Sequence, residues 1–219
     1  MAELVEVHFR HRVLPSRSKV KPGVSIAGLI LSGGASRRMG TPKALLKFEG
    51  ETFLDRLIRL FSVVCSPVIV VVGHHAAQIQ AGIERASEAV FAVNPDPERG
   101  MLSSLQCGLA KAPADADAVM FLPVDHPHLD PATLATLAAR FETDRAPVTV
   151  PTYRGAHGHP VCIARALVDE LLALPLDAKA SDVIHRYVPQ TVYVEVPDRA
   201  VVTDVDDPAA YAELLARRS

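Results

Sequence analysis

Residues Ile26–Leu46 read IAGLILSGGASRRMGTPKALL, and the architecture of the chain can be worked out from this stretch. Its apolar part, Ile26–Leu31, stops at Ser32-Gly33-Gly34. An apolar run closed by glycines is typical of a buried parallel strand that ends in a loop at the carboxyl edge of a sheet, where open α/β sheets bind ligands. Glycines let the loop backbone approach an anion closely. Three basic side chains then add positive charge: Arg37, Arg38 and Lys43. The stretch therefore predicts a polyphosphate-binding loop.

The spacing of the loop excludes two common phosphate-binding motifs. A P-loop requires the pattern G-x-x-x-x-G-K-[ST], but here Gly40 is followed by Thr41 and Pro42 before Lys43. The dinucleotide fingerprint G-x-G-x-x-G is absent as well. A glycine turn with solvated arginines is the simpler alternative, and it leaves the pattern LSGGASRRMGTPK unexplained.

Composition limits the class of protein. A chain of 219 residues is long enough for one α/β domain with a sizeable core. A net charge of −2, a pI near 6.5 and only 5% aromatic residues do not suggest a nucleic-acid or membrane-surface partner. No apolar run approaches the ~18 residues that span a bilayer, and no signal peptide is visible. The three cysteines, Cys65, Cys107 and Cys162, fit free thiols, so we expect a cytoplasmic protein.

Strands alternate with helices along most of the chain, after a basic segment with little periodicity. We interpret residues 1–23 as a loosely held extension, with a basic arm for a partner as the alternative, and residues 24–219 as one domain. Strands are expected at residues 26–31, 67–73, 89–94, 118–123, 148–150, 160–163 and 191–196. Helices are expected at residues 53–61, 75–86, 101–112, 131–141, 165–174 and 180–187, and from residue 208. This order predicts βαβ units and a mostly parallel sheet, whose second half builds the acceptor side of a cleft.

Acidic residues supply candidate metal ligands. Asp125 directly follows the strand at 118–123, and a carboxylate at a strand's carboxyl end, facing a phosphate loop, suits Mg²⁺. A second group occurs in VTDVDDP, where Asp204 and Asp206 alternate along an extended segment and should point in opposite directions. Only one of these two should then face the metal. Asp207 is better explained as the N-cap of the last helix.

These three segments together resemble the MobA/MocA-type molybdenum cofactor nucleotidyltransferases, over about residues 25 to 215. The segments are the glycine loop ending in Lys43, the D-x-P of Asp125–Pro127 and the D-V-D-x-P of Asp204–Pro208. Two more, Gly100–Leu109 and Tyr153–Val161, are similar to the MocA-like cytidylyltransferase branch. The resemblance implies an α/β, single-domain, Rossmann-like three-layer α/β/α fold of the nucleotide-diphospho-sugar transferase type, with a mostly parallel mixed sheet.

The resemblance also implies a reaction and a set of roles. A phosphate of the acceptor, molybdopterin in that family, attacks the α-phosphorus of CTP or GTP, and Mg²⁺ assists the release of pyrophosphate. The nucleotide-binding residues would be Leu31, Ser32, Gly33, Gly34, Arg38, Lys43, Ser103, Ser104 and Asp125. Catalysis would depend on Lys43, Arg38 and Asp125, with the metal held by Asp125 and Asp204, or by Asp206 in place of Asp204. The acceptor side would include His126, His157 and His159, and transient docking to a molybdoenzyme is a further expectation.

Two departures from the family pattern leave alternatives open. The family often has Gln or Met between the Asp and Pro of the metal motif, where this chain has His126. The loop reads LSGG, whereas cytidylyl-specific members tend to have LAAG and guanylyl-specific ones LAGG, so Gly34 favours a purine while the other motifs favour CTP. A sugar-phosphate acceptor and a non-catalytic nucleotide-binding delivery protein are the other functional hypotheses. A zinc site made of His126, His128, His157 and His159 is less well supported, because the H-P-H and H-G-H spacings are permissive.

Overall fold

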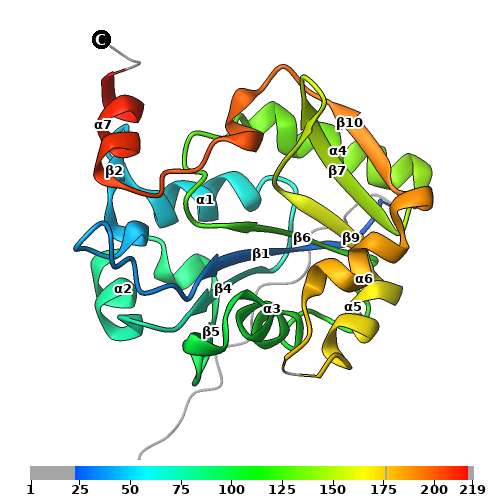
Figure 1. Cartoon of the computed structure of the whole chain (residues 1–219), viewed down its shortest axis with the longest axis horizontal. Coiled ribbons are helices and arrows are strands. Elements are labelled where there is room, and N and C mark those ends of the chain that lie inside the picture. Colours follow the sequence, from blue (N-terminus) through cyan, green and yellow to red (C-terminus); the bar gives the residue numbers. More distant parts are fainter. Residues whose placement is uncertain (1–22, 176, 217–219) are drawn as a thin grey trace, which may run out of the picture.

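A mixed β-sheet of eight strands runs through the centre of the part of the chain described by the computed structural model, residues 23–175 and 177–216 (Figure 1). The predicted N-terminal extension, apart from Gly23, lies outside the described residues. The strand order is β10-β7-β9-β6-β1-β4-β5, with β8 paired to β7. The strands are β1 (Ile26–Ser32), β4 (Val68–Val72), β5 (Val90–Val93), β6 (Ala118–Pro123), β7 (Val148–Tyr153), β8 (Ala156–His157), β9 (Val161–Ala164) and β10 (Val192–Glu195).

The predicted mostly parallel sheet is confirmed. Strand β1 lies between β4 and β6 and is parallel to both, β5 is parallel to β4, and β10 is parallel to β7. Strand β9 is antiparallel to both β6 and β7, which makes the sheet mixed. A separate two-stranded hairpin, β2 (Lys47–Phe48) and β3 (Glu51–Thr52), follows the glycine loop.

Three of the helices in the described part of the chain, α1, α4 and α7, begin at residues whose side chains cap them. The helices are α1 (Phe53–Phe61), α2 (Ala76–Gly82), α3 (Met101–Leu109), α4 (Pro131–Asp144), α5 (Arg165–Leu172), α6 (Ala180–Arg186) and α7 (Pro208–Ala216), with short 3₁₀ turns η1 (Lys43–Leu45), η2 (Ala86–Glu88), η3 (Pro97–Arg99), η4 (Val188–Gln190) and η5 (Arg199–Val202). Side chains of Thr52, Asp130 and Asp207 accept backbone N–H groups of the first turns of α1, α4 and α7. Among the described residues, none of the helices has both the length and the apolar character to span a membrane.

Helix α2 is shorter than predicted, because it ends at Gly82 rather than near residue 86. The buried carboxylate of Asp55, on α1, accepts the backbone N–H groups of Glu84 at 2.9 Å and Arg85 at 2.8 Å. Those amides therefore donate to a side chain about 30 residues earlier in the sequence, and not to the carbonyl groups of α2. A buried carboxylate that accepts backbone amides is satisfied, whereas continuing the helix would leave it unpaired.

Two hydrophobic cores, one on each face of the sheet, make the three-layer arrangement (Figure 1). Along β1, Ile26 and Ile30 belong to the core shared with α1 and α4, while Leu29 and Leu31 belong to the core shared with α3, α5 and α6. This alternation follows from the two-residue period of a strand. All these side chains are apolar because helices cover both faces. The expected α/β three-layer fold is confirmed.

Helix α3 packs very closely on the sheet, which positions its first turn. A Cβ atom placed on Gly108 would lie 2.3 Å from Leu29 Cδ1 and 2.7 Å from Val71 Cγ2. Only glycine fits at this contact, so the helix axis approaches β1 and β4. The first turn of α3, with Ser104, is thereby brought against the loop that leaves β1, where Ser104 Oγ would contact a Cβ on Gly33 at 2.7 Å.

Candidate active site

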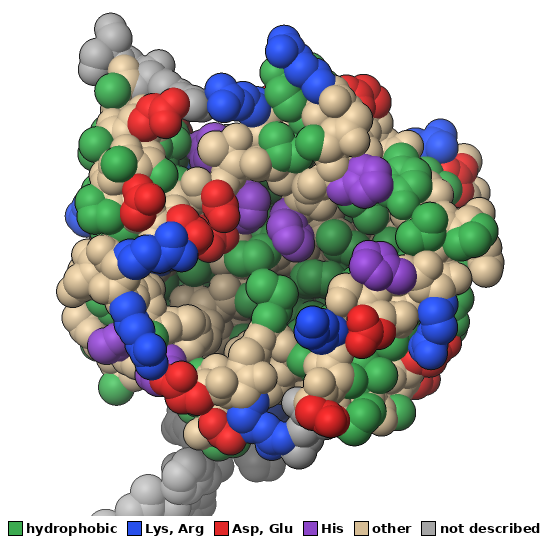
Figure 2. All heavy atoms as spheres, in the orientation of Figure 1, with side chains coloured by type: hydrophobic (Ala, Val, Ile, Leu, Met, Phe, Trp, Pro, Cys, Tyr) green, Lys and Arg blue, Asp and Glu red, His purple; other side chains and the backbone are tan. Residues whose placement is uncertain are grey.

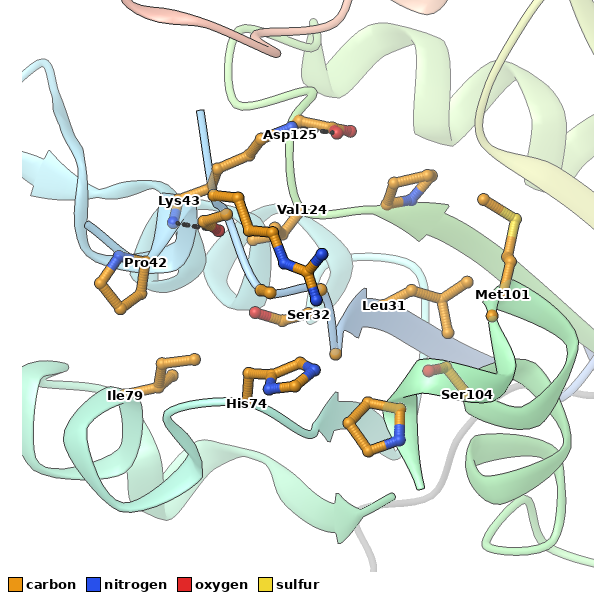
Figure 3. A pocket seen from close by; sticks show the side chains of 18 of the residues that line it. Leu31, Ser32, Pro42, Lys43, His74, Ile79, Met101, Ser104, Val124 and Asp125 are labelled. Atoms are coloured by element: carbon orange, nitrogen blue, oxygen red, sulfur yellow. Dashed lines mark hydrogen bonds and ion pairs between the residues drawn. The ribbon is translucent and has the colours of Figure 1, made fainter. Parts of the chain in front are cut away.

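A cleft of about 530 Å³ opens at the carboxyl ends of β1 and β6 (Figure 3). Its lining comes from segments far apart in the sequence: the glycine loop after β1, His74 and Ile79 after β4, the residues that lead into α3, the end of β6, and Asp206. Its lining includes the predicted Leu31, Ser32, Gly33, Gly34, Arg38, Lys43, Ser104 and Asp125, together with Asp206. The cleft therefore lies where parallel sheets bind ligands, and its volume is in the range of small-molecule sites.

The glycine loop folds back on itself so that Lys43 points into the cleft. Ser36 has a positive φ of 48° and Gly40 one of 67°, which turn the chain. The Ser36 hydroxyl accepts the Lys43 backbone N–H at 3.1 Å and so holds the start of η1. Gly34 has open space where a Cβ would stand, because no atom lies within 4 Å of that position. The loop backbone is therefore accessible to an anion at Gly34.

Lys43 links two acidic residues that are 81 positions apart in the chain. Its Nζ atom lies 2.9 Å from Asp125 Oδ2 and 2.5 Å from Asp206 Oδ1, and its side chain is only 14% exposed. Burial alone lowers the pKa of Lys43, but hydrogen bonds and charges of Asp206 and Asp125 outweigh it, so the pKa is raised above its ordinary value. The lysine is therefore a fixed positive charge at physiological pH.

Asp206 also forms an ion pair with Arg38, whose NH2 atom lies 3.0 Å from Asp206 Oδ2. The hydrogen bond from Lys43 lowers the pKa of Asp206, with Arg38 adding to the effect. Arg38 is largely exposed, with 69% of its side chain accessible. Its guanidinium is therefore free to move toward a triphosphate, because an exposed ion pair holds it only weakly.

The acidic residues fit a hard divalent cation. Ligand oxygens of Asp125, Asp204 and Asp206 all lie within 4.8 Å of one another. Asp125 Oδ1 is buried and has no hydrogen-bond partner among the described residues, and such an atom ordinarily has one. Mg²⁺ prefers oxygen ligands, and the three carboxylates supply such ligands around one point. Asp204 and Asp206 both reach this point, contrary to the expected opposite directions, because residues 203–206 do not form a strand.

The two predicted serines on α3 have different positions. Ser104 lines the cleft, whereas Ser103 does not and donates to the Gly100 carbonyl at 2.9 Å. Both hydroxyls accept from Asn94 Nδ2, at 2.9 and 3.0 Å. Asn94 is a buried residue that the sequence analysis missed, although it directly follows β5. A polar residue at the carboxyl end of a strand was the available signal.

A second set of residues that sequence reasoning missed lies at the mouth of the cleft. Glu98 Oε1 lies 3.1 Å from Arg37 NH2 and 3.1 Å from His74 Nε2. His74 follows β4 and lines the cleft, although in the sequence it has the features of a surface loop residue. Its position directly after a buried strand was again the signal. Arg37 and Glu98 are mostly exposed, so this bridge lies at the rim.

The predicted acceptor-side histidines do not line the 530 Å³ cleft. His126 is buried, and its Nδ1 lies 3.0 Å from the Ala200 carbonyl oxygen. The ring of His159 lies 5.4 Å from that of His126, and burial, followed by the nearby His126, lowers the pKa of His159 to about 4. His157 is exposed and stacks on Tyr193 with ring centroids 4.4 Å apart.

Histidines lie near acidic side chains around a hollow on the face shown in Figure 2. Among the described residues, the side chains clustered closely enough to hold a metal ion are the three aspartates, and no group of histidines is clustered in this way. The zinc hypothesis therefore gains no support from the described part of the chain. The site instead contains a loop suited to an anion, a lysine with most of its side chain buried, and clustered carboxylates. These groups together suit a reaction of a polyphosphate.

The sequence matches the model of the MobA-like NTP transferase domain family over residues 28–192. The chain belongs to this family. The matched region contains the glycine loop, Lys43 and Asp125, but it ends before Asp204 and Asp206. This MobA-like chain is therefore a nucleotidyltransferase, and part of its acidic cluster comes from the segment that follows the matched domain.

Relatives of the MobA-like chain include molybdenum cofactor cytidylyltransferases and guanylyltransferases. A molybdenum cofactor cytidylyltransferase of Escherichia coli is 24% identical over 180 residues, which cover 82% of this chain and 90% of that protein. A molybdenum cofactor guanylyltransferase of Sinorhizobium fredii is 34% identical over 115 residues, 52% of this chain and 50% of that protein. The crystal structure of Rv0371c from Mycobacterium tuberculosis superposes with a TM-score of 0.76 at 25% identity, covering 89% of this chain and 99% of that one.

Proposed function

We propose that the protein transfers a nucleoside monophosphate from an NTP, with CTP favoured, to the phosphate of molybdopterin, and that it needs Mg²⁺ and releases pyrophosphate. The observation that carries this proposal is the position of Lys43. Its ammonium lies between Asp125 and Asp206, beside a glycine loop with an open backbone. Charge neutralisation and positioning are what nucleotidyl transfer requires from a protein.

The chemistry follows from the charges in the cleft. An oxygen of the acceptor phosphate attacks the α-phosphorus, the bond from that phosphorus to the oxygen bridging the β-phosphate breaks, and pyrophosphate leaves with the electron pair. No protein nucleophile or general base is needed, because the attacking phosphate is already anionic. The backbone at Gly33 and Gly34, with Arg38, would hold the triphosphate. When bound at Asp125 and a second aspartate, Mg²⁺ would supply positive charge to the phosphate oxygens.

Lys43 would change partners during the reaction. In the arrangement described above its charge is neutralised by Asp125 and Asp206. A metal ion on these carboxylates would replace the ammonium electrostatically, which leaves Lys43 available for the α-phosphate. Asp206 is the stronger candidate for the second carboxylate, because it lines the cleft and contacts Lys43, whereas Asp204 is exposed.

The base preference rests on two unequal arguments. The likeness to the E. coli cytidylyltransferase extends over 82% of the chain, whereas the likeness to the S. fredii guanylyltransferase covers about half of it. The loop sequence LSGG, with Gly34, argues for GTP, because it resembles the LAGG of guanylyl-specific members more than the LAAG of cytidylyl-specific ones. We therefore propose CTP first and GTP as the second candidate. Delivery of the product to a docked molybdoenzyme is part of the same proposal.

Calorimetric binding of CTP, GTP, ATP and UTP, each with and without Mg²⁺, is the first test. Metal-dependent preference for CTP supports the proposal, and preference for GTP selects the guanylyl alternative. Pyrophosphate release with molybdopterin and with a panel of sugar phosphates then identifies the acceptor. Nucleotide binding without pyrophosphate release for any acceptor would instead support a delivery protein, and absence of nucleotide binding would leave only the fold in common with the family.

A further inference from the structure

The side chain of Asn94 is oriented by the backbone around it. Asn94 directly follows β5 and is 5% exposed. Its own backbone N–H donates to the Val72 carbonyl at 2.7 Å, which holds the residue against β4. The Asp96 N–H donates to Asn94 Oδ1 at 3.0 Å. An N–H group only donates, so the atom that faces Asp96 must be the oxygen, and the Nδ2 group must point the other way.

The two N–H groups of Asn94 Nδ2 donate to two serine hydroxyls on α3. Nδ2 lies 2.9 Å from Ser103 Oγ and 3.0 Å from Ser104 Oγ. Ser103 gives its own proton to the Gly100 carbonyl at 2.9 Å, so this hydroxyl both accepts and donates. Ser104 Oγ accepts from Asn94 in the same way, but no residue in the described part of the chain accepts its proton. A lone pair of Ser104 faces Asn94, so its proton must point elsewhere.

The Ser104 hydroxyl borders the cleft. Ser104 is 7% exposed and belongs to the lining of the cleft. A Cβ atom placed on Gly33 would lie 2.7 Å from Ser104 Oγ, so glycine at this position leaves the hydroxyl uncovered. Polar side-chain atoms with so little exposure ordinarily have their hydrogen bonds satisfied. A ligand in the cleft can supply the acceptor that the Ser104 proton lacks.

Ser104 lies away from the charged part of the cleft. In Figure 3 it is grouped with Leu31 and Met101, whereas Lys43 and Asp125 lie on the other side. The triphosphate of the proposed substrate would occupy the side with Lys43, because an anion is stabilised by positive charge there. The nucleobase would then lie at Leu31 and Met101, whose apolar side chains suit the faces of a ring. A hydroxyl beside these side chains would meet the polar edge of that ring.

We propose that Ser104 donates a hydrogen bond to an acceptor atom of the nucleobase, and that Asn94 is the positioning residue that enforces this direction. The inference rests on the nucleotide site of the proposed function. Asn94 does not line the cleft and acts through Ser104. Because Asn94 presents an N–H group, the Ser104 hydroxyl cannot turn its proton away from the cleft toward Asn94. Cytosine and guanine both carry carbonyl and ring-nitrogen acceptors, so the contact orients the base and leaves the choice between CTP and GTP to other groups.

The test is calorimetric binding by the full chain with Mg²⁺ present and two probes. One probe is CTP or GTP, whichever the wild-type protein prefers, and the other is inorganic triphosphate, which has no base. Asn94→Asp keeps the shape of the side chain but presents a carboxylate, which only accepts, so the Ser104 proton would turn toward it and the cleft would face a lone pair. Ser104→Ala removes the hydroxyl. Ser103→Ala is the matched control, because Ser103 also accepts from Asn94 but does not line the cleft.

We expect Asn94→Asp and Ser104→Ala each to weaken nucleotide binding about tenfold, while changing the binding of inorganic triphosphate less than about twofold. Ser103→Ala should change the binding of either probe less than about twofold. The double variant Asn94→Asp/Ser104→Ala should bind the nucleotide about as well as Ser104→Ala alone, because Asn94 acts through Ser104. Asn94→Ala leaves the hydroxyl free to rotate, and it replaces Asn94→Asp should the buried carboxylate prevent folding. It should weaken nucleotide binding about threefold, and only where Ser104 is present.

The outcomes that overturn the inference are distinct from those that overturn the proposed function. Equal losses for the nucleotide and for inorganic triphosphate in Ser104→Ala would mean that the hydroxyl binds the phosphates and not the base. Additive losses in the double variant would mean that Asn94 does not act through Ser104. Either result overturns the inference while the wild-type protein still binds the nucleotide. Absence of nucleotide binding by the wild-type protein overturns the proposed function itself.

Discussion

The two oxygens of Asp125 face parts of the site that are held in different ways. Oδ2 faces the charged side, which we define as Arg38, Lys43 and Asp206, where every contact is an ion pair between side chains. Oδ1 faces the histidine side, defined as His126 and His159, where backbone groups hold the residues. The Ala200 carbonyl accepts from His126, and the Val201 carbonyl accepts the His159 N–H at 2.8 Å.

The difference indicates which part rearranges and which stays fixed. Partly exposed ion pairs contribute little to stability and exchange partners easily, as transfer of a charged group requires. Groups held by buried backbone hydrogen bonds keep their orientation, because leaving a carbonyl unpaired costs about 1–3 kcal/mol. Substitutions on the charged side should therefore change turnover with little effect on stability, whereas substitutions on the histidine side should act mainly through stability.

The largest effect is expected for Asp125→Ala, because this residue belongs to both sides. Loss of a metal ligand removes several kcal/mol of transition-state stabilisation, and each 1.36 kcal/mol is about tenfold in rate, so turnover should fall about 10³-fold or more. Asp125 lies in a loop with 16% of its side chain exposed, so we expect the fold to persist, as circular dichroism would report. Turnover within tenfold of the wild-type rate contradicts the assignment of Asp125 to the metal.

A smaller loss, about 10²-fold in kcat, is expected for Lys43→Ala, with much less change in the dissociation constant of the nucleotide. The reason is that Lys43 is neutralised by Asp125 and Asp206 before substrate binds and would act on charge that develops later. Lys47→Ala is the matched control, because Lys47 is an exposed lysine on β2. Single-turnover rates and calorimetric affinities separate the two quantities. Equal losses in both would mean that Lys43 only binds.

The two aspartates after η5 provide a sharper comparison within the charged side. Asp206→Asn should lower turnover about tenfold at fixed Mg²⁺ and raise the metal concentration required, since Asp206 contacts Lys43 and Arg38. Asp204→Asn should change turnover less than about threefold, because Asp204 is exposed. Turnover of both variants, measured against the metal concentration, shows which substitution has the larger effect. The reverse order would favour Asp204 as the second metal ligand.

Much of the fold was predictable because its signals are local. The apolar runs of β1, β4 and β6 and the caps at Thr52, Asp130 and Asp207 are readable in a few consecutive residues. The end of α2 was not, because it depends on Asp55, a residue on another helix. The β2–β3 hairpin was missed since strands of two residues carry no periodicity.

The site was predictable where a motif carries it and less so where tertiary contacts build it. The glycine loop, Lys43 and Asp125 were named from spacing, and the structure brings them into one cleft. The directions of Asp204 and Asp206 differ from expectation, because strand alternation does not apply to a segment fixed by the bond from Val205 to Asp125. Asn94 was missed because its importance comes from two serines on α3.

The smallest effect on turnover, and a clear one on stability, is expected for His159→Gln. In the folded protein the pKa of His159 is about 4, whereas an unfolded histidine titrates near about 6.5. The unfolded chain therefore binds more protons between these values, so stability is complete above about pH 6.5 and falls as the pH drops toward 4. At pH 5 the loss amounts to about 2 kcal/mol.

Urea unfolding of the chelated protein at pH 7 and pH 5 measures this loss, which His159→Gln should largely remove and His157→Gln should leave in place. His157 is exposed, unlike His159, so the pair isolates burial as the cause. Turnover of His159→Gln at pH 7 should stay within about threefold of the wild-type value, since its backbone N–H still binds Val201. If the pH dependence persisted in His159→Gln, the burial of His159 would not be its cause, and the division of Asp125 between a rearranging side and a fixed side would lose this support.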